Sequence, residues 1–191
     1  KPWTEVFENI YVEMGNEAWN AAGYATGSYN GPEHWKDIFA AGKASPHYRK
    51  KILFVAGAQA GNPGMAKRVL ANAPNADRLA VAPYMIHHLK KADVAPLNTD
   101  AKLFRWVFGF AARRVLHEHG CVRRNFACAR EHNTELAVYE HNYHITKPSA
   151  KDDGAPIALR NRIIASLGGG ITLVNDALLM RKQSMQLPVA D

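Results

Sequence analysis

Short apolar runs alternate along the chain with longer segments whose apolar residues recur at helical spacing. The runs lie at residues 10–14, 52–56, 79–82, 136–139 and 171–174. Each run is followed by glycine, proline or polar residues, which punctuate strands. A continuous apolar run such as 52–56 predicts a strand that is buried on both faces of a parallel sheet. The pattern therefore predicts five strands.

Helices are predicted between these strands. They cover residues 33–42, 100–119, 156–167 and 177–185, and a further helix begins at residue 62. Pro63 suits a first helical turn, and Thr99 is placed to cap the long helix that follows it. Gly168, Gly169 and Gly170 are expected to end a helix before the last strand.

Strands that alternate with helices predict an α/β fold in which successive βα units build a parallel sheet. Residues 1–191 show no internal repeat or linker, so we expect a single domain. Two architectures accept five such units: a doubly wound open sheet, and an incomplete (β/α)8 TIM barrel. In both architectures the chemistry gathers at the carboxyl ends of the strands.

Composition narrows the class of protein only moderately. The chain is 47% hydrophobic and 21% charged, which is ordinary for a globular protein and argues against disorder. The longest apolar runs are shorter than a membrane span requires, so we expect no membrane partner. Cys121 and Cys128 exclude a disulfide scaffold and a four-cysteine metal site, and their spacing leaves a bridge or two thiols open.

The formal net charge of +7 favours anionic partners without naming one. Six arginines are close in sequence, and we expect a solvated helix face, with an acidic polysaccharide or, less favoured, nucleic acid as alternatives. They are Arg105, Arg113, Arg114, Arg123, Arg124 and Arg130.

Polar and aromatic side chains gather after three of the predicted strands. Glu17 follows the first strand and Glu140 follows the fourth. Such groups are costly to bury unpaired, so a purely structural strand end would seldom collect them. The neighbours that we expect to bind substrate are Asn16, Trp19, Tyr84, His87, Asn142 and His144.

Two carboxylates that face each other across a cleft are what glycoside cleavage requires. One must be protonated to donate to the departing oxygen, and the other must be ionised to attack the sugar or to activate water. Glu17 and Glu140 are the candidate pair, and Trp19 offers a flat face on which a sugar ring could stack.

Two segments resemble a known family. Residues 11–17 (YVEMGNE) resemble the strand-four Asn-Glu motif of the clan-A retaining glycoside hydrolases, which are (β/α)8 barrels. Residues 138–142 (VYEHN) are similar to the strand-seven segment that carries their nucleophile. The nearest likeness is to the α-L-arabinofuranosidase type of that clan. The five strands would then be strands four to eight of the barrel.

The resemblance implies roles for individual residues. Glu17 would be the general acid/base and Glu140 the nucleophile. Asn16 would bind near the sugar 2-hydroxyl, and Tyr84 would orient Glu140. It also implies a secreted enzyme, extracellular or periplasmic, that degrades a plant- or algal-type polysaccharide or oligosaccharide without a cofactor.

Five strands of a barrel would leave two unpaired edges and an uncovered apolar interior. The chain begins at Lys1 and is shorter than the roughly 250 residues of a typical barrel. We therefore expect a second polypeptide, or a preceding segment of the same precursor, to complete the barrel.

Other interpretations stay open at this point. Glu17 could be a helix-initiating acid, Glu140 a structural ion-pair partner, and Trp19 a packing residue. The chain could also be a non-catalytic carbohydrate-binding or assembly subunit. A third hypothesis is a metal-dependent hydrolase that uses Glu140, His141 and His144, although no His-Glu-x-x-His signature is present.

Overall fold

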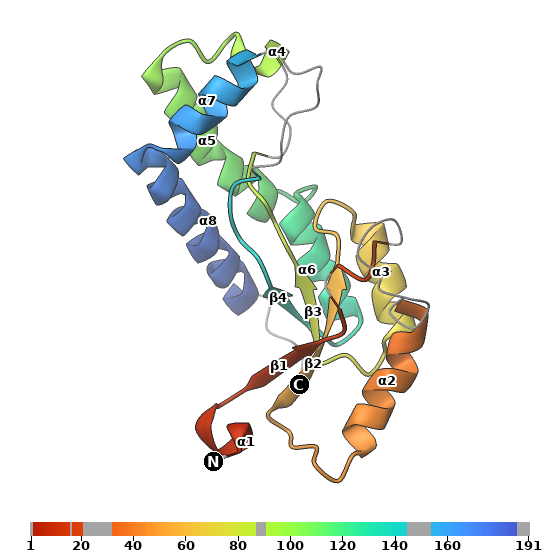
Figure 1. The fold of residues 1–191 in the computed structure, drawn as a ribbon. Helices are drawn as coiled ribbons and strands as arrows, with labels where there is room; N and C mark the ends of the chain where they lie inside the picture. Colours follow the sequence, from red (N-terminus) through yellow and green to blue (C-terminus); the bar gives the residue numbers. More distant parts are fainter. Residues whose placement is uncertain (1, 16, 21–31, 87–90, 145–153, 187–191) are drawn as a thin grey trace. The chain divides into compact units, whose positions relative to one another are not determined.

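The computed structural model describes residues 2–15, 17–20, 32–86, 91–144 and 154–186 (Figure 1). The chain divides into two compact units. Unit 1 takes in the described residues up to Ala82 together with Arg124–Tyr139. Unit 2 takes in Pro83–Arg123 and the described residues from Glu140 onward.

Unit 1 contains a parallel sheet whose strands are neighbours in the order in which they occur in the sequence. The strands are β1 (Ile10–Glu13), β2 (Ile52–Ala58), β3 (Arg78–Val81) and β4 (Glu135–Val138), in the order β1-β2-β3-β4. Every neighbouring pair is parallel. Four of the five predicted strands are therefore confirmed, and so is the α/β fold class.

Helices of unit 1 pack against this sheet through one core. They are α2 (Pro32–Ala44), α3 (Pro63–Asn72) and the larger part of α6 (Cys121–Glu131), and a short α1 (Trp3–Val6) precedes β1. The rings of Phe39 and Phe54 stack with centroids 5.1 Å apart, which joins α2 to β2. Ala66 and Val69 of α3 belong to the same buried cluster. Burial of these side chains removes apolar surface from water and holds the helices on the sheet.

Local signals set the helix starts as the sequence predicts. The side chain of Asn62 accepts a hydrogen bond from the Met65 amide at 3.3 Å, and Pro63 occupies the first turn of α3. The Thr99 hydroxyl accepts one from the Lys102 amide at 3.3 Å at the start of α5 (Asp100–Val115). Both caps satisfy amides that a helix N-terminus leaves without a partner.

Unit 2 is built mainly from helices. Besides α5 it contains α4 (Lys91–Val94), α7 (Gly154–Ile164) and α8 (Leu167–Gln186). Its core includes Leu103 and Val107 of α5 and Ile163 of α7, all fully buried. An extended segment after β3 and another after β4 meet in this unit at a parallel bridge between Met85 and Tyr143.

The prediction of a fifth strand at residues 171–174 is wrong, because this segment lies inside α8. Three of its four residues are β-branched, yet this preference for a strand is weak against tertiary packing. The buried positions of α8 recur at helical spacing, and they include Thr172, Asp176 and Met180. A helix lets this face pack on α5, whereas a strand would turn alternate residues away.

The expectation that Gly168, Gly169 and Gly170 end a helix is also wrong, because these glycines lie in the first turn of α8. The Ser166 hydroxyl accepts a hydrogen bond from the Gly169 amide at 3.0 Å, as an N-cap does. The predicted helix at 100–119 is confirmed in part: α5 ends at Val115, and the next helix, α6, begins at Cys121.

Across the described part of the chain, no single helix is long and apolar enough to cross a membrane. One bent pair, Ile157–Ile164 with Leu167–Gln183, meets the length and composition criteria together at an angle of 76°.

The glycines at the start of α8 allow a test of this helix assignment. A Cβ on Gly169 would lie 2.1 Å from the Ile163 carbonyl oxygen, whereas a Cβ on Gly170 would meet nothing within 4 Å. We expect Gly169→Ala to destabilise the protein by about 1–3 kcal/mol, because the backbone of α7 would have to move. We expect Gly170→Ala to stabilise it by about 0.5–1 kcal/mol, as alanine does inside a helix.

Thermal unfolding of the two variants measures these effects, and each kcal/mol corresponds to roughly 2–4 °C for a chain of this size. Equal melting temperatures for the neighbouring variants would contradict the assignment of a tight α7–α8 turn.

Candidate active site

The ends of β3 and β4 bring Tyr84 and Glu140 together in unit 2. The segments that follow the two strands run parallel, with the Met85 amide donating to the Asn142 carbonyl at 2.9 Å and the His144 amide to the Met85 carbonyl at 3.0 Å. Between these segments the Tyr84 hydroxyl donates a hydrogen bond to Oε2 of Glu140. Because Glu140 is exposed, its carboxylate is accessible to a substrate.

Two neighbouring residues shape the surroundings of Tyr84. The ring of His144 meets that of Tyr84 edge-on, with centroids 5.2 Å apart and planes at 65°. The Asn142 side chain accepts a hydrogen bond from the Tyr143 amide at 2.8 Å, so its carbonyl oxygen supports the local turn. His144 is thus directly beside the Tyr84–Glu140 pair, while Asn142 is exposed two residues beyond Glu140.

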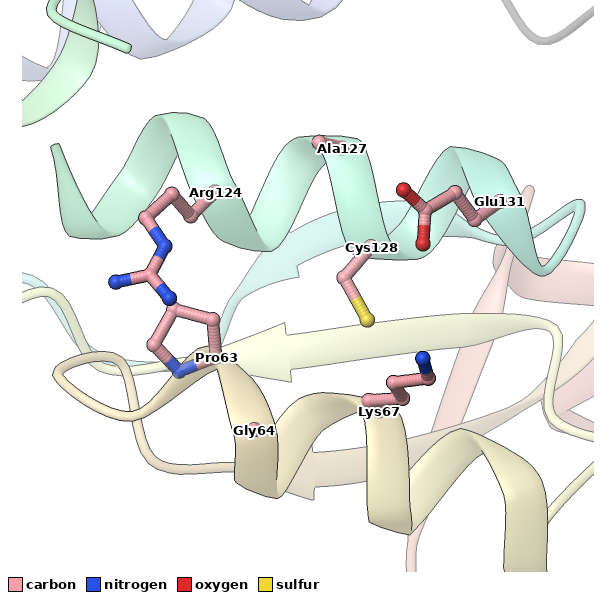
Figure 2. Close-up of a pocket in the computed structure, with 7 residues that line it drawn as sticks. All are labelled: Pro63, Gly64, Lys67, Arg124, Ala127, Cys128 and Glu131. Carbon is pink, nitrogen blue, oxygen red and sulfur yellow. The ribbon is translucent and has the colours of Figure 1, made fainter. Parts of the chain in front are cut away.

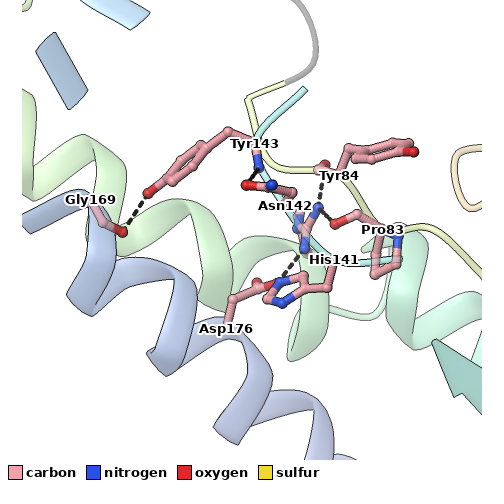
Figure 3. A network of polar contacts seen from close by, with 8 residues as sticks. Pro83, Tyr84, His141, Asn142, Tyr143, Gly169 and Asp176 are labelled. Atoms are coloured by element: carbon pink, nitrogen blue, oxygen red, sulfur yellow. Dashed lines mark hydrogen bonds and ion pairs between the residues drawn. The ribbon is translucent and has the colours of Figure 1, made fainter. Parts of the chain in front are cut away.

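Tyr143 anchors the segment after β4 to the helices of unit 2 (Figure 3). Its hydroxyl donates to the Gly169 carbonyl at 2.7 Å, and its side chain is buried. Burial raises the pKa of Tyr143 above its ordinary value of 10, and the hydrogen bond with Thr172 partly opposes that rise. Tyr143 therefore stays a neutral donor at physiological pH.

A buried charged group contacts the segments that carry Tyr84 and Glu140. Oδ2 of Asp176 is 2.5 Å from Nη2 of Arg114 and 2.8 Å from Nε2 of His141 (Figure 3). Asp176 is fully buried and Arg114 almost so. The expectation that Arg114 belongs to a solvated helix face is therefore wrong. Asp176 was not predicted as a site residue, and the signal that could have found it is an acid at helical spacing from Thr172 and Met180.

Glu17 lies in unit 1, in a turn that follows β1. Its carbonyl accepts a hydrogen bond from the Asn20 amide at 2.8 Å, so a turn rather than a helix follows Glu17 in residues 17–20. Its φ of 49° is in the left-handed region, as is that of Gly15 at 75°. Few non-glycine residues adopt this conformation, and such strain is concentrated at functional sites. Ile86, two residues beyond Tyr84, also has a left-handed backbone conformation, with a φ of 56°.

Glu13 is a carboxylate that the sequence analysis did not single out. A Cβ on Gly57 would lie 2.5 Å from Oε1 of Glu13 and 3.5 Å from Cδ1 of Trp19. The missing side chain of Gly57 thus makes room for the Glu13 carboxylate beside the indole. Burial, and secondarily the nearby charge of Glu17, raise the pKa of Glu13 above its ordinary value of 4.5. A glutamate inside an apolar strand is the signal that could have found it.

The remaining predicted site residues have different outcomes. Trp19 is 9% exposed and belongs to the core of unit 1, which fits the packing interpretation better than a sugar platform. Its indole nitrogen is buried without a hydrogen-bond partner among the described residues. Asn16 and His87 lie outside the described residues.

A cavity of about 310 Å³ lies between α3 and α6 in unit 1 (Figure 2). Its charged lining residues are Lys67, Arg124 and Glu131. The thiol of Cys128 points into it, and burial, reinforced by Glu131, raises the pKa of that thiol above 9.0. Cys121 and Cys128 are both free thiols, which answers the question that their spacing left open.

The described residues give no support to the metal-dependent hypothesis. Within them, no three His, Cys, Asp or Glu side chains come together as metal ligands would. Of the residues in that hypothesis, His141 binds Asp176 and Glu140 accepts from Tyr84.

Comparisons with known proteins identify no relative. No family model, no curated protein and no solved structure matches this chain.

The raised pKa of Glu13 predicts a pH-dependent stability. A glutamate whose folded pKa exceeds its unfolded pKa stabilises the fold fully below the unfolded value, near 4.5, and that contribution is lost as the pH rises through the folded pKa. Glu13→Gln does not titrate. We therefore expect this variant to gain stability over the wild type progressively from about pH 4.5 upward and to hold that gain at neutral pH.

Chemical denaturation at several pH values between 4 and 8 measures this difference. Glu8→Gln, at an exposed position next to β1, is the matched control and should change the free energy of unfolding by less than about 0.5 kcal/mol at each pH. A Glu13→Gln effect that is the same at pH 4 and pH 8 would contradict the burial argument.

Proposed function

We propose that this chain is the catalytic part of a retaining glycoside hydrolase of the α-L-arabinofuranosidase-like kind. The observation that carries the proposal is the hydrogen bond from the Tyr84 hydroxyl to the Glu140 carboxylate at the ends of two adjacent parallel strands. A carboxylate that is exposed, and is oriented by a neutral donor, is suited to attack a sugar carbon. Glu17, which follows another strand of the same sheet, supplies a second carboxylate.

The proposed reaction is a double displacement. Glu140 attacks the anomeric carbon and forms a covalent glycosyl ester while Glu17 protonates the departing glycosidic oxygen. Glu17 then takes a proton from water, and the water oxygen attacks the anomeric carbon and releases Glu140 as a carboxylate. Tyr84 holds Glu140 in place, and Asn16, His144 and Asn142 are the proposed contacts for sugar hydroxyls.

We also propose that the sheet is part of a (β/α)8 barrel, completed by another polypeptide or by a further segment of the same precursor. Strands β1 and β4 are the two edges of the described sheet. Tyr11 and Val12 on one edge and Val138 on the other are large apolar residues that are left exposed. Exposed strand edges favour pairing with additional strands. The proposed substrate is an extracellular polysaccharide or oligosaccharide.

Replacing either proposed catalytic carboxylate tests the mechanism. We expect Glu17→Gln to lower kcat/KM on aryl glycosides by about 10²–10⁴-fold, the usual contribution of a general acid/base. We expect Glu140→Gln to lower it at least as much, because no glycosyl ester can form. Azide should restore turnover of Glu140 variants only as a glycosyl azide of inverted configuration, since azide then attacks in place of the nucleophile.

Glu118→Gln, at an exposed carboxylate with 80% side-chain exposure, is the matched control and should keep wild-type activity. Sugar binding without hydrolysis by the wild type would instead identify a non-catalytic carbohydrate-binding subunit. Loss of activity with a chelator would favour the metal-dependent alternative.

Tyr84→Phe tests the hydrogen bond on its own. The substitution removes one hydroxyl and keeps the ring that meets His144. A hydrogen bond to a charged group contributes about 1.5–3 kcal/mol, so we expect kcat to fall by about 10–100-fold with little change in the melting temperature. Steady-state kinetics with a matched unfolding curve measures both, and unchanged kcat in the folded variant would remove Tyr84 from the mechanism.

A further inference from the structure

The segments that carry Tyr84 and Glu140 both contact one buried ion pair, Arg114–Asp176. Asp176, on α8, is fully buried, and its Oδ2 accepts hydrogen bonds from Arg114 and from His141. His141 directly follows Glu140 in the chain. One carboxylate oxygen therefore reaches the segment that carries Glu140.

The same buried pair also reaches the segment that carries Tyr84. Nη1 of Arg114, on α5, donates to the carbonyl oxygen of Pro83 at 2.6 Å and to that of Tyr84 at 2.5 Å. The guanidinium therefore joins these two carbonyls to Asp176. The planar fork of arginine suits this double role, because its donors have fixed directions.

Packing alone does not explain a charged pair at this position. Burying two charges costs desolvation, and apolar residues of similar volume often replace a buried ion pair without loss of stability. What apolar residues cannot do is bind the two segments at once. The ion pair fixes the backbone at residue 84 and the side chain at residue 141, and the Tyr84–Glu140 hydrogen bond depends on the relative placement of those segments.

We propose that Asp176 is a positioning residue, which acts with Arg114 and His141 to hold Glu140 against Tyr84. The inference rests on the proposed function, because it assigns these residues to the placement of the proposed nucleophile. Asp176 itself is buried and touches no substrate in this assignment.

The double variant Arg114→Met/Asp176→Leu tests the proposal. It removes both charges together, so no unpaired charge stays buried and the helices keep an apolar contact of similar volume. We expect a folded protein with a melting temperature close to that of the wild type. We expect kcat per folded molecule to fall by about 10²-fold, the usual effect of a small misplacement of a reacting group, with KM nearly unchanged.

Arg113→Met is the matched control, because Arg113 directly precedes Arg114 in α5 and is exposed. Its guanidinium donates to the Trp106 carbonyl and does not reach residues 83–84 in the described contacts. This variant should keep the wild-type kcat. If the double variant fails to fold, His141→Phe decides: it keeps an aromatic ring, loses only the contact with Asp176, and should lower kcat by about 10-fold.

A measurement that needs no turnover separates this inference from the proposed function. In protein labelled with ¹³C at the tyrosine Cζ, the Tyr84 resonance is assigned by its loss in Tyr84→Phe. We expect this resonance to move in Arg114→Met/Asp176→Leu toward its position in Glu140→Ala, and to stay in place in Arg113→Met.

The outcomes are distinct. Movement of the Tyr84 resonance together with loss of kcat supports the proposal. Movement of the resonance in a protein that hydrolyses no glycoside supports the positioning of Glu140 and overturns the proposed function. A folded double variant with an unmoved resonance and wild-type kcat overturns the positioning role and leaves the glycosidase proposal intact.

Discussion

Parallel pairing of consecutive strands is the constraint on which the candidate site depends. Because β3 and β4 are adjacent and parallel, the segments that leave them emerge at the same edge of the sheet. The pairing then continues beyond the strands, through the bridge between Met85 and Tyr143. Tyr84 and Glu140, which are 56 positions apart in sequence, meet for this reason. An antiparallel arrangement would have sent their segments to opposite edges of the sheet.

The candidate site also depends on the face of α8 that packs against α5. Its buried positions include Thr172, Asp176 and Gln183, while Leu167 and Val174 are exposed. Polar residues thus share this buried face with Met180, which departs from the usual distribution of polar and apolar residues on a helix of a globular protein. Asp176 binds Arg114 of α5, whereas Thr172 donates to the Gly168 carbonyl within α8 itself at 2.8 Å. The Asp176–Arg114 ion pair is therefore a specific contact that adds to the apolar packing of α8.

These two features explain which strands and site residues could be predicted from the sequence. Strands were predictable where an apolar run ends at a glycine or proline, as at Gly57 and Pro83, because both the burial and the stop are local properties. The run at 171–174 is likewise short and mostly apolar, yet its packing against α5 is tertiary and overrides local preference. Glu17 and Glu140 could be singled out as strand-end carboxylates. Arg114 could not, because composition assigns charged residues to the surface, and only the fold pairs Arg114 with Asp176.

The environment of Glu13 connects the sheet to the proposed barrel. Alternation along β2 directs Phe54 and Ala56 to the helices, and therefore directs Gly57 to the opposite face, where Glu13 lies against it. In a (β/α)8 barrel that face is the packed interior, which excludes water. In the described structure, burial of the Glu13 carboxyl group is the main cause that raises its pKa. Closure of the proposed barrel would bury Glu13 further, so its stability cost at neutral pH should be larger in the completed barrel.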